Sequence, residues 1–278
     1  MKIDIPVFQG LDLTIADEPN ERMAYPTTRL PKGISMVYLG QDLAEEGLGF
    51  GVPILMRGVQ TVFPGNIELH LLQREPAWSI AAVYKMNLVE RIVQRGSASL
   101  KNEVLYTIKD FLGASIRRFP ATRASLTAIS SGLRRLFGLE TSFEVAEASG
   151  EVEVRYRFNQ PGECLQVDVS IASLTRNGIT ELIVMNEQGA HSFDQYRDSS
   201  GISLAGKEIG IWDEVGAQEA SFASPTRKVS FALPRVAGGR LFRGRELIGS
   251  RLAWAGFGYS LPPAAGGFNY EVRFRQIP

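Results

Sequence analysis

The chain has 278 residues, of which 44% are hydrophobic and 22% charged, and its 30 basic side chains balance 30 acidic ones. This length can bury one large β-rich core or two smaller ones, and the zero net charge gives no field that would favour nucleic acid or an anionic membrane. Cys164 is the single cysteine, so an internal disulfide and a cysteine-based metal cluster are excluded.

Targeting and membrane-spanning signals are weak throughout the sequence. No window approaches the roughly 20 apolar residues that cross a bilayer, and no apolar stretch of signal-peptide length follows the first residues. We therefore expect a cytoplasmic protein without nucleic-acid or membrane partners, and without a cofactor or a bound metal; its oligomeric state is left open.

Strand-like segments fill the first third of the chain. Residues 34–39 predict a strand, residues 66–73 alternate between apolar and polar, and residues 78–95 predict a long strand. The glycine-rich segment 47–51 is spaced like a nucleotide loop, but Val52-Pro53 follows it where a helix would be required. We interpret that segment as a bend or β-bulge.

Residues 99–137 predict a pair of helices. In the first half, apolar residues recur every three or four positions, which places them on one helical stripe. Phe119-Pro120 ends this helix, because the residue before a proline is disfavoured in helical geometry. Thr122 can cap a second helix, and Gly138 is suited to end it.

Strand signals become regular after Gly138. Ser149-Gly150 predicts a tight turn between strands at 141–148 and 151–158, and Asn177-Gly178 predicts a second hairpin, between strands at 165–174 and 180–185. Further strands are predicted at 191–197, 209–215, 228–233, 252–260 and 268–275.

These segments indicate a mainly β fold, a large antiparallel two-sheet β-sandwich over residues 1–278 with the helical pair at about 99–137 inserted. The alternative is an α+β unit over residues 1–138 followed by a separate β-sandwich over residues 139–278. No polar or Pro/Gly-rich linker marks that boundary, which favours the single domain.

Residues Gly206–Pro234, GKEIGIWDEVGAQEASFASPTRKVSFALP, resemble a segment of galactose mutarotase-like β-sandwich domains of carbohydrate-active enzymes. In both, a strand with an aromatic residue and an acid precedes a loop and a strand of the V-x-F-x-L kind. The resemblance implies a sugar bound on a concave sheet. The mutarotases use histidine and glutamate pairs, but this chain has two histidines and no motif onto which those roles can be carried over.

Glu68 and His70 are the candidate catalytic residues. They lie two positions apart on a predicted strand, so their side chains project to the same face. A carboxylate beside an imidazole can act as general acid and base. A metal site would need a third ligand from elsewhere, and the simpler interpretation is a solvated sheet face.

Two further groups combine polar and aromatic side chains, which suit sugar hydroxyls and the apolar face of a sugar ring. They are interpreted as substrate-binding residues, with an ordinary polar edge strand as the alternative. The candidates are His191, Asp194, Tyr196, Arg197, Trp212 and Asp213.

The sequence thus favours a carbohydrate-binding or carbohydrate-processing β-sandwich protein of open specificity, and leaves open whether it is an enzyme. The alternative is a non-catalytic protein-interaction or assembly module. That alternative predicts an exposed apolar patch of several hundred Å².

Overall fold

The computed structural model describes residues 1–17, 30–45, 47–58, 60–95, 139–159, 163–171, 178–248, 252–262 and 267–277. The chain divides into two compact units, Met1–Val89 with Val145–Pro278, and Glu90–Glu144. The predicted helical pair at 99–137 lies outside the described residues and stays a prediction, as does the division of residues 1–278 into domains.

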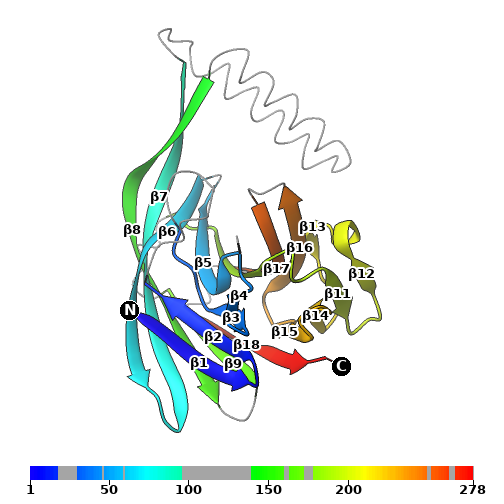
Figure 1. Cartoon of the computed structure of the whole chain (residues 1–278). Helices are drawn as coiled ribbons and strands as arrows, with labels where there is room; N and C mark the ends of the chain where they lie inside the picture. The colour runs from blue at the N-terminus through cyan, green and yellow to red at the C-terminus, as the bar shows by residue number, and fades with distance from the viewer. Residues whose placement is uncertain are drawn as a thin grey trace. The chain divides into compact units, whose positions relative to one another are not determined.

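A small antiparallel sheet begins the chain, with the order β1-β2-β3-β4 (Figure 1). Its strands are β1 (Lys2–Phe8), β2 (Leu11–Ala16), β3 (Ser35–Tyr38) and β4 (Gln41–Asp42). Alternate residues of β1 and β2 are buried, because successive side chains of a strand point to opposite faces and one face meets the core. The strand predicted at 34–39 is confirmed as β3.

The other strands form one 14-stranded sheet with the order β12-β11-β14-β15-β18-β9-β8-β7-β6-β5-β10-β17-β16-β13. Their bounds are β5 (Gly49–Arg57), β6 (Gln60–Gln73), β7 (Ala77–Arg95), β8 (Leu139–Asn159), β9 (Cys164–Ser170), β10 (Glu181–Gln188), β11 (Gln195–Asp198), β12 (Ser203–Ala205), β13 (Ile211–Glu214), β14 (Glu219–Ser224), β15 (Val229–Pro234), β16 (Arg240–Ile248), β17 (Leu252–Leu261) and β18 (Gly267–Gln276). A short 3-10 helix, η2 (Gly206–Ile209), precedes β13.

Aromatic contacts show that two parts of this sheet, far apart in the strand order, face each other. Phe50 on β5 packs edge-on against Phe231 on β15, with ring centroids 5.2 Å apart, although many strands separate β5 from β15 in the sheet order. Phe222 on β14 and Phe257 on β17 pack in the same way at 4.9 Å. The sheet therefore encloses one shared core between two layers, which confirms the mainly β, antiparallel sandwich.

The end of β10 carries consecutive buried polar residues, each holding the backbone N–H of a different segment. Because a buried polar group without a partner is costly, these bonds fix how the segments cross the strand. The pairs are Gly51 N to Asn186 Oδ1 at 3.2 Å, Leu48 N to Glu187 Oε2 at 3.1 Å, and Met36 N to Gln188 Oε1 at 3.1 Å.

The tight turn predicted at Ser149-Gly150 is wrong. Both residues lie inside β8, which runs without reversal from Leu139 to Asn159 between β7 and β9. Gly150 has a φ of +97°, which a glycine adopts readily and which here bends the strand locally. The neighbouring β7 is 19 residues long, so pairing along that length prevails over the local turn signal.

The hairpin predicted around Asn177-Gly178 is also wrong. β9 pairs with β8 and β18, whereas β10 pairs with β5 and β17. The two strands therefore belong to separate regions of the sheet. Their partners come from distant parts of the sequence, which a local turn signal does not encode.

The glycine-rich segment forms the bulge that the sequence predicts. Gly49 and Gly51 have φ values of +81° and +82°, and the β5–β10 register shifts between Met185 and Asn186. A Cβ on Gly51 would lie 2.8 Å from the Tyr156 hydroxyl oxygen, so the core itself requires glycine at this position.

Candidate functional site

The outward side of β8, β9 and β18 carries polar side chains at alternate positions and two pockets. Along β8, Val152, Val154 and Tyr156 are buried, while the residues between them face outward. β9 and β18 alternate in the same way. We call the outward side of these three strands the polar face.

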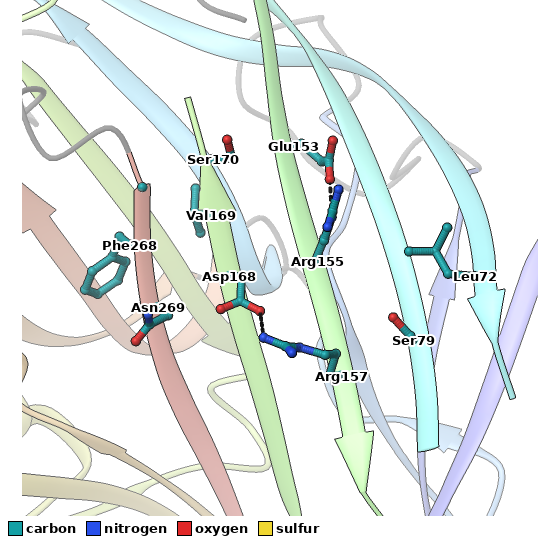
Figure 2. Close-up of a pocket in the computed structure, with 11 residues that line it drawn as sticks. Leu72, Ser79, Glu153, Arg155, Arg157, Asp168, Val169, Ser170, Phe268 and Asn269 are labelled. Carbon is teal, nitrogen blue, oxygen red and sulfur yellow. Dashed lines mark hydrogen bonds and ion pairs between the residues drawn. The ribbon is translucent and has the colours of Figure 1, made fainter. Parts of the chain in front are cut away.

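A shallow pocket of about 640 Å³ lies on the polar face and extends to β6 and β7 (Figure 2). Its lining residues are Leu72, Ser79, Glu153, Arg155, Arg157, Asp168, Val169, Ser170, Gly267, Phe268 and Asn269. Strand pairing aligns the central ones, because Arg155 on β8 lies opposite Asp168 on β9, and Asp168 lies opposite Asn269 on β18. Three strands thus place donors and acceptors side by side on a rigid scaffold.

The charged side chains of this pocket are paired with each other. Arg157 Nη2 donates to Asp168 Oδ2 at 2.5 Å, and Arg155 Nε donates to Glu153 Oε1. Figure 2 shows the Arg155–Glu153 pair along β8 and Arg157 reaching from β8 to Asp168 on the neighbouring β9. Two arginines meet two acids, so the pocket has no net charge, while the outer atoms of each pair stay exposed to a ligand.

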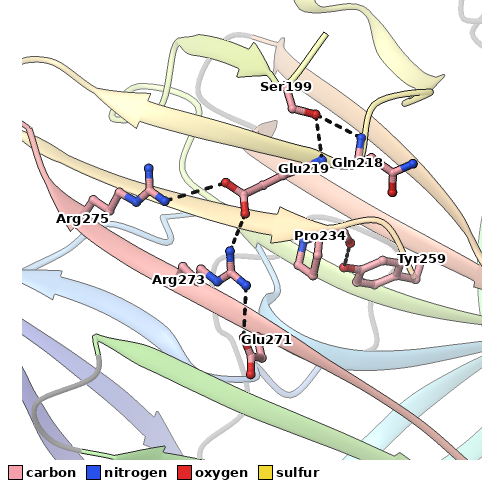
Figure 3. A network of polar contacts seen from close by, with 8 residues as sticks. All are labelled: Ser199, Gln218, Glu219, Pro234, Tyr259, Glu271, Arg273 and Arg275. Atoms are coloured by element: carbon pink, nitrogen blue, oxygen red, sulfur yellow. Dashed lines mark hydrogen bonds and ion pairs between the residues drawn. The ribbon is translucent and has the colours of Figure 1, made fainter. Parts of the chain in front are cut away.

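A second pocket, of about 430 Å³, lies on the same three strands. Its charged residues are Glu163, Glu271, Arg273 and Arg275, which again balance. Arg273 donates to Glu219 Oε2 at 2.7 Å and to Glu271 Oε2 at 3.4 Å (Figure 3). Cys164 lines this pocket, and partial burial raises the pKa of its thiol to about 11, so the sulfur is protonated and uncharged at neutral pH.

The predicted catalytic residues Glu68 and His70 are both exposed on β6, as their alternation predicts, but they do not line either pocket. The Lys85 ammonium on β7 donates to the Glu68 carboxylate and lowers its pKa. A carboxylate held in its charged form can accept a proton but is a poor proton donor. Within the described residues no hydrogen bond or ion pair joins either one to the predicted substrate-binding group.

The predicted substrate-binding residues His191, Asp194, Tyr196 and Arg197 are dispersed. Tyr196 is buried in the core and donates to Asp198 Oδ2 at 2.8 Å. His191 lies in the turn before β11, with Nδ1 2.6 Å from Glu45 Oε2. Asp194 and Arg197 are exposed.

Arg243 links two of the predicted residues. Its guanidinium lies 4.7 Å from the centre of the Tyr196 ring and 3.7 Å from Asp213 Oδ2. Trp212, next to Asp213, is half-buried and stacks on Trp254 with ring centroids 4.6 Å apart. The structure therefore gathers Tyr196, Trp212 and Asp213 near β16, away from Glu68 and His70 in the strand order.

The residues of the polar face were not among the predicted site residues. Their signal is present in the sequence, because Glu153, Arg155 and Arg157 alternate with apolar residues along one strand. What the sequence lacks is the pairing of this strand with β9, and of β9 with β18, about 100 positions further along the chain. The pocket exists only after these strands have paired.

Other functional features are limited in the part of the chain that the structure covers. No group of three or more His, Cys, Asp or Glu side chains there is placed to hold a metal ion. No helix among those residues is both long and apolar enough to span a bilayer. Their exposed large hydrophobic side chains come from separate segments, namely Met1, Leu39, Leu72, Ile202 and Leu247. The interaction-module alternative therefore stays a prediction.

Comparison with known proteins finds no matching family model and no matching curated protein. Among solved structures, an alpha-N-acetylgalactosaminidase from Bifidobacterium bifidum, a quadruple mutant, is similar over 98% of this chain at 9% identity, with a TM-score of 0.49. This chain spans about a third, 36%, of that protein's length. A galactose mutarotase-like protein from Lactobacillus casei is similar over 99% of each chain at 10% identity, with a TM-score of 0.37. The structures similar to this chain thus include one of the family that residues Gly206–Pro234 resemble.

Proposed function

We propose that this protein binds a carbohydrate, and that the ligand occupies the first pocket of the polar face. The observation that carries the proposal is the balanced pairing of the charges in that pocket, Arg157 with Asp168 and Arg155 with Glu153. Each pair presents fixed N–H donors beside fixed carboxylate acceptors. A sugar hydroxyl both donates and accepts, so neighbouring hydroxyls can bond to both partners of a pair.

The charge balance also argues against other ligand classes. An anion such as a phosphate would favour an excess of arginine, and a metal cation an excess of carboxylate. Leu72 adds an apolar wall, with 55% of its surface exposed at the side of the pocket. An apolar wall beside fixed polar groups suits a ring with hydroxyls at its edge and C–H groups on its faces.

The proposal assigns binding, and no chemical step, to this pocket. Glu68 and His70 share the outward side of the sheet with it but lie outside its lining. Trp212 and Asp213 belong to another region, near β16. Their predicted roles in catalysis and substrate binding stay predictions.

The test is a binding titration by calorimetry with glucose, galactose, mannose and their 2-acetamido forms. Arg157→Gln keeps hydrogen-bonding groups but removes the guanidinium, and we expect it to weaken binding about tenfold. Arg240→Gln is the matched control, because Arg240 also faces an acid, Glu181 at 3.6 Å, and its side chain is 58% exposed against 53% for Arg157. The control should bind like the unmodified protein.

Salt dependence separates a neutral sugar from an anion. Between about 0.05 and about 0.5 M salt we expect the affinity to change less than about twofold, since screening weakens interactions between charges. Failure of every sugar in the panel to bind, or equal losses in Arg157→Gln and Arg240→Gln, would contradict the proposal.

A further inference from the structure

We infer that the carbohydrate is an oligosaccharide, which lies along the strands and occupies both pockets of the polar face at once. This inference rests on the proposed function and names the ligand class more closely. It starts from the positions of the two pockets, which are built on the same strands, β8, β9 and β18.

The two pockets meet at one row of the sheet. Arg157 lines the first pocket and lies directly opposite Gln166 on β9, which lines the second. Gln166 in turn lies opposite Glu271 on β18, also in the second pocket. Strand pairing therefore places the two pockets next to each other on the sheet, and we call the surface that they cover together the track.

The track is longer than a single sugar ring. It follows β9 from Ser170, in the first pocket, to Cys164, in the second, and this strand has 7 residues. At about 3.3 Å per residue the track extends for about 20 Å. Several linked sugar rings are needed to fill it.

The same chemistry repeats at both ends of the track. In the second pocket Arg273 is fixed between Glu219 and Glu271, as Arg155 and Arg157 are fixed by acids in the first (Figure 3). Each pocket carries two arginines and two acids. A ligand that presents the same hydroxyl pattern in each unit matches such a repeated arrangement, whereas a monosaccharide contacts one pocket only.

Chain length provides the test. We would measure by calorimetry the binding of glucose, maltotetraose and cellotetraose, and of galactose and β-1,4-galactotetraose. We expect one tetrasaccharide to bind at least about tenfold more tightly than its monosaccharide. Arg273→Gln, on the exposed surface of the second pocket, should weaken that tetrasaccharide about fivefold and leave the monosaccharide unchanged.

Two variants distinguish failure of this inference from failure of the proposed function. Arg157→Gln should weaken mono- and tetrasaccharide alike, and Arg240→Gln should change neither. Equal affinities for mono- and tetrasaccharide, with monosaccharide binding still weakened by Arg157→Gln, would overturn the inference of an oligosaccharide and leave the proposed function standing. Sugar binding that Arg157→Gln does not alter, or no binding at all, would overturn both.

Discussion

Two outward regions of the large sheet differ in whether their charged and apolar side chains are exposed or buried. On the polar face, the arginine and acid side chains are partly exposed and paired with each other, within β8 and between strands. Outside β5 and β10, a second apolar cluster forms from Leu30, Leu48, Val52 and Met185. There the carboxyl of Glu187 is buried, and Trp254 is 5% exposed beneath the stacked ring of Trp212. We call this cluster, together with Glu187 and Trp254, the covered region.

The difference teaches where this fold can carry a binding site. Exposed ion pairs contribute little to stability, so the polar face can serve a ligand without supporting the core. In the covered region the side chains are buried instead: burial raises the pKa of Glu187 to about 7, and the Trp254 ring stacks on Trp212. Its residues stabilise the sandwich, so substitutions that remove buried side chains there should lower the free energy of unfolding.

The largest expected effect is from Trp254→Ala in the covered region. Removing a buried ring that stacks on Trp212 and lies over Gly244 should lower the free energy of unfolding by about 3–5 kcal/mol. Leu72→Ala on the polar face is the control, and it should change that free energy by less than about 0.5 kcal/mol. Denaturant unfolding measures both. A loss below about 1 kcal/mol in Trp254→Ala would mean that the covered region does not stabilise the fold.

The second-largest expected effect is a dependence of the free energy of unfolding on pH, caused by Glu187. Its folded pKa of about 7 lies above the ordinary value of 4.5, so between these pH values the folded state binds more protons than the unfolded state. The free energy of unfolding therefore falls as the pH rises through this window, by about 3 kcal/mol in total, and levels off above it.

Glu187→Gln removes this titration, and its unfolding free energy should be nearly the same at about pH 5 and about pH 8. The matched control is Glu153→Gln on the polar face. Its free energy of unfolding should fall with rising pH as steeply as that of the unmodified protein. The idea fails if Glu187→Gln shows the same fall.

The smallest effect is expected where the binding site is proposed. The double variant Arg157→Gln with Asp168→Asn should change the free energy of unfolding by less than about 1 kcal/mol, since both side chains of this pair are partly solvated. Thermal unfolding followed by calorimetry measures the change. A loss above about 2 kcal/mol would place this pair among the structural interactions and remove the contrast between the two regions.

Much of the fold could be predicted from local patterns. The alternation of residues 66–73 and the length of the strand at 78–95 appear as β6 and β7, because a half-buried strand must place apolar residues on one face. The local sequence could not show that the hairpins predicted at Ser149-Gly150 and Asn177-Gly178 do not form, because pairing with distant strands overrides each turn signal.

The candidate site was predictable only in its parts. The outward row Glu153, Arg155 and Arg157 can be read from one strand, but its partners Asp168 and Asn269 depend on the register of β9 and β18. Conversely, tyrosine is a residue type suited to bind a sugar, but Tyr196 is buried in the core. Residue type indicates what a side chain can bind, whereas tertiary structure decides whether a ligand can reach it.

The three polar residues at the end of β10 have a consequence for how the molecule comes apart. Through Gln188 and Met36 this strand holds the small sheet, and through Asn186 and Gly51 it holds the bulge of β5. Peeling either element away would break these buried hydrogen bonds and expose apolar surface of the shared core to water, and both changes cost free energy. Both sheets are thus bound into a single cooperative unit, which loses its structure in one step rather than layer by layer.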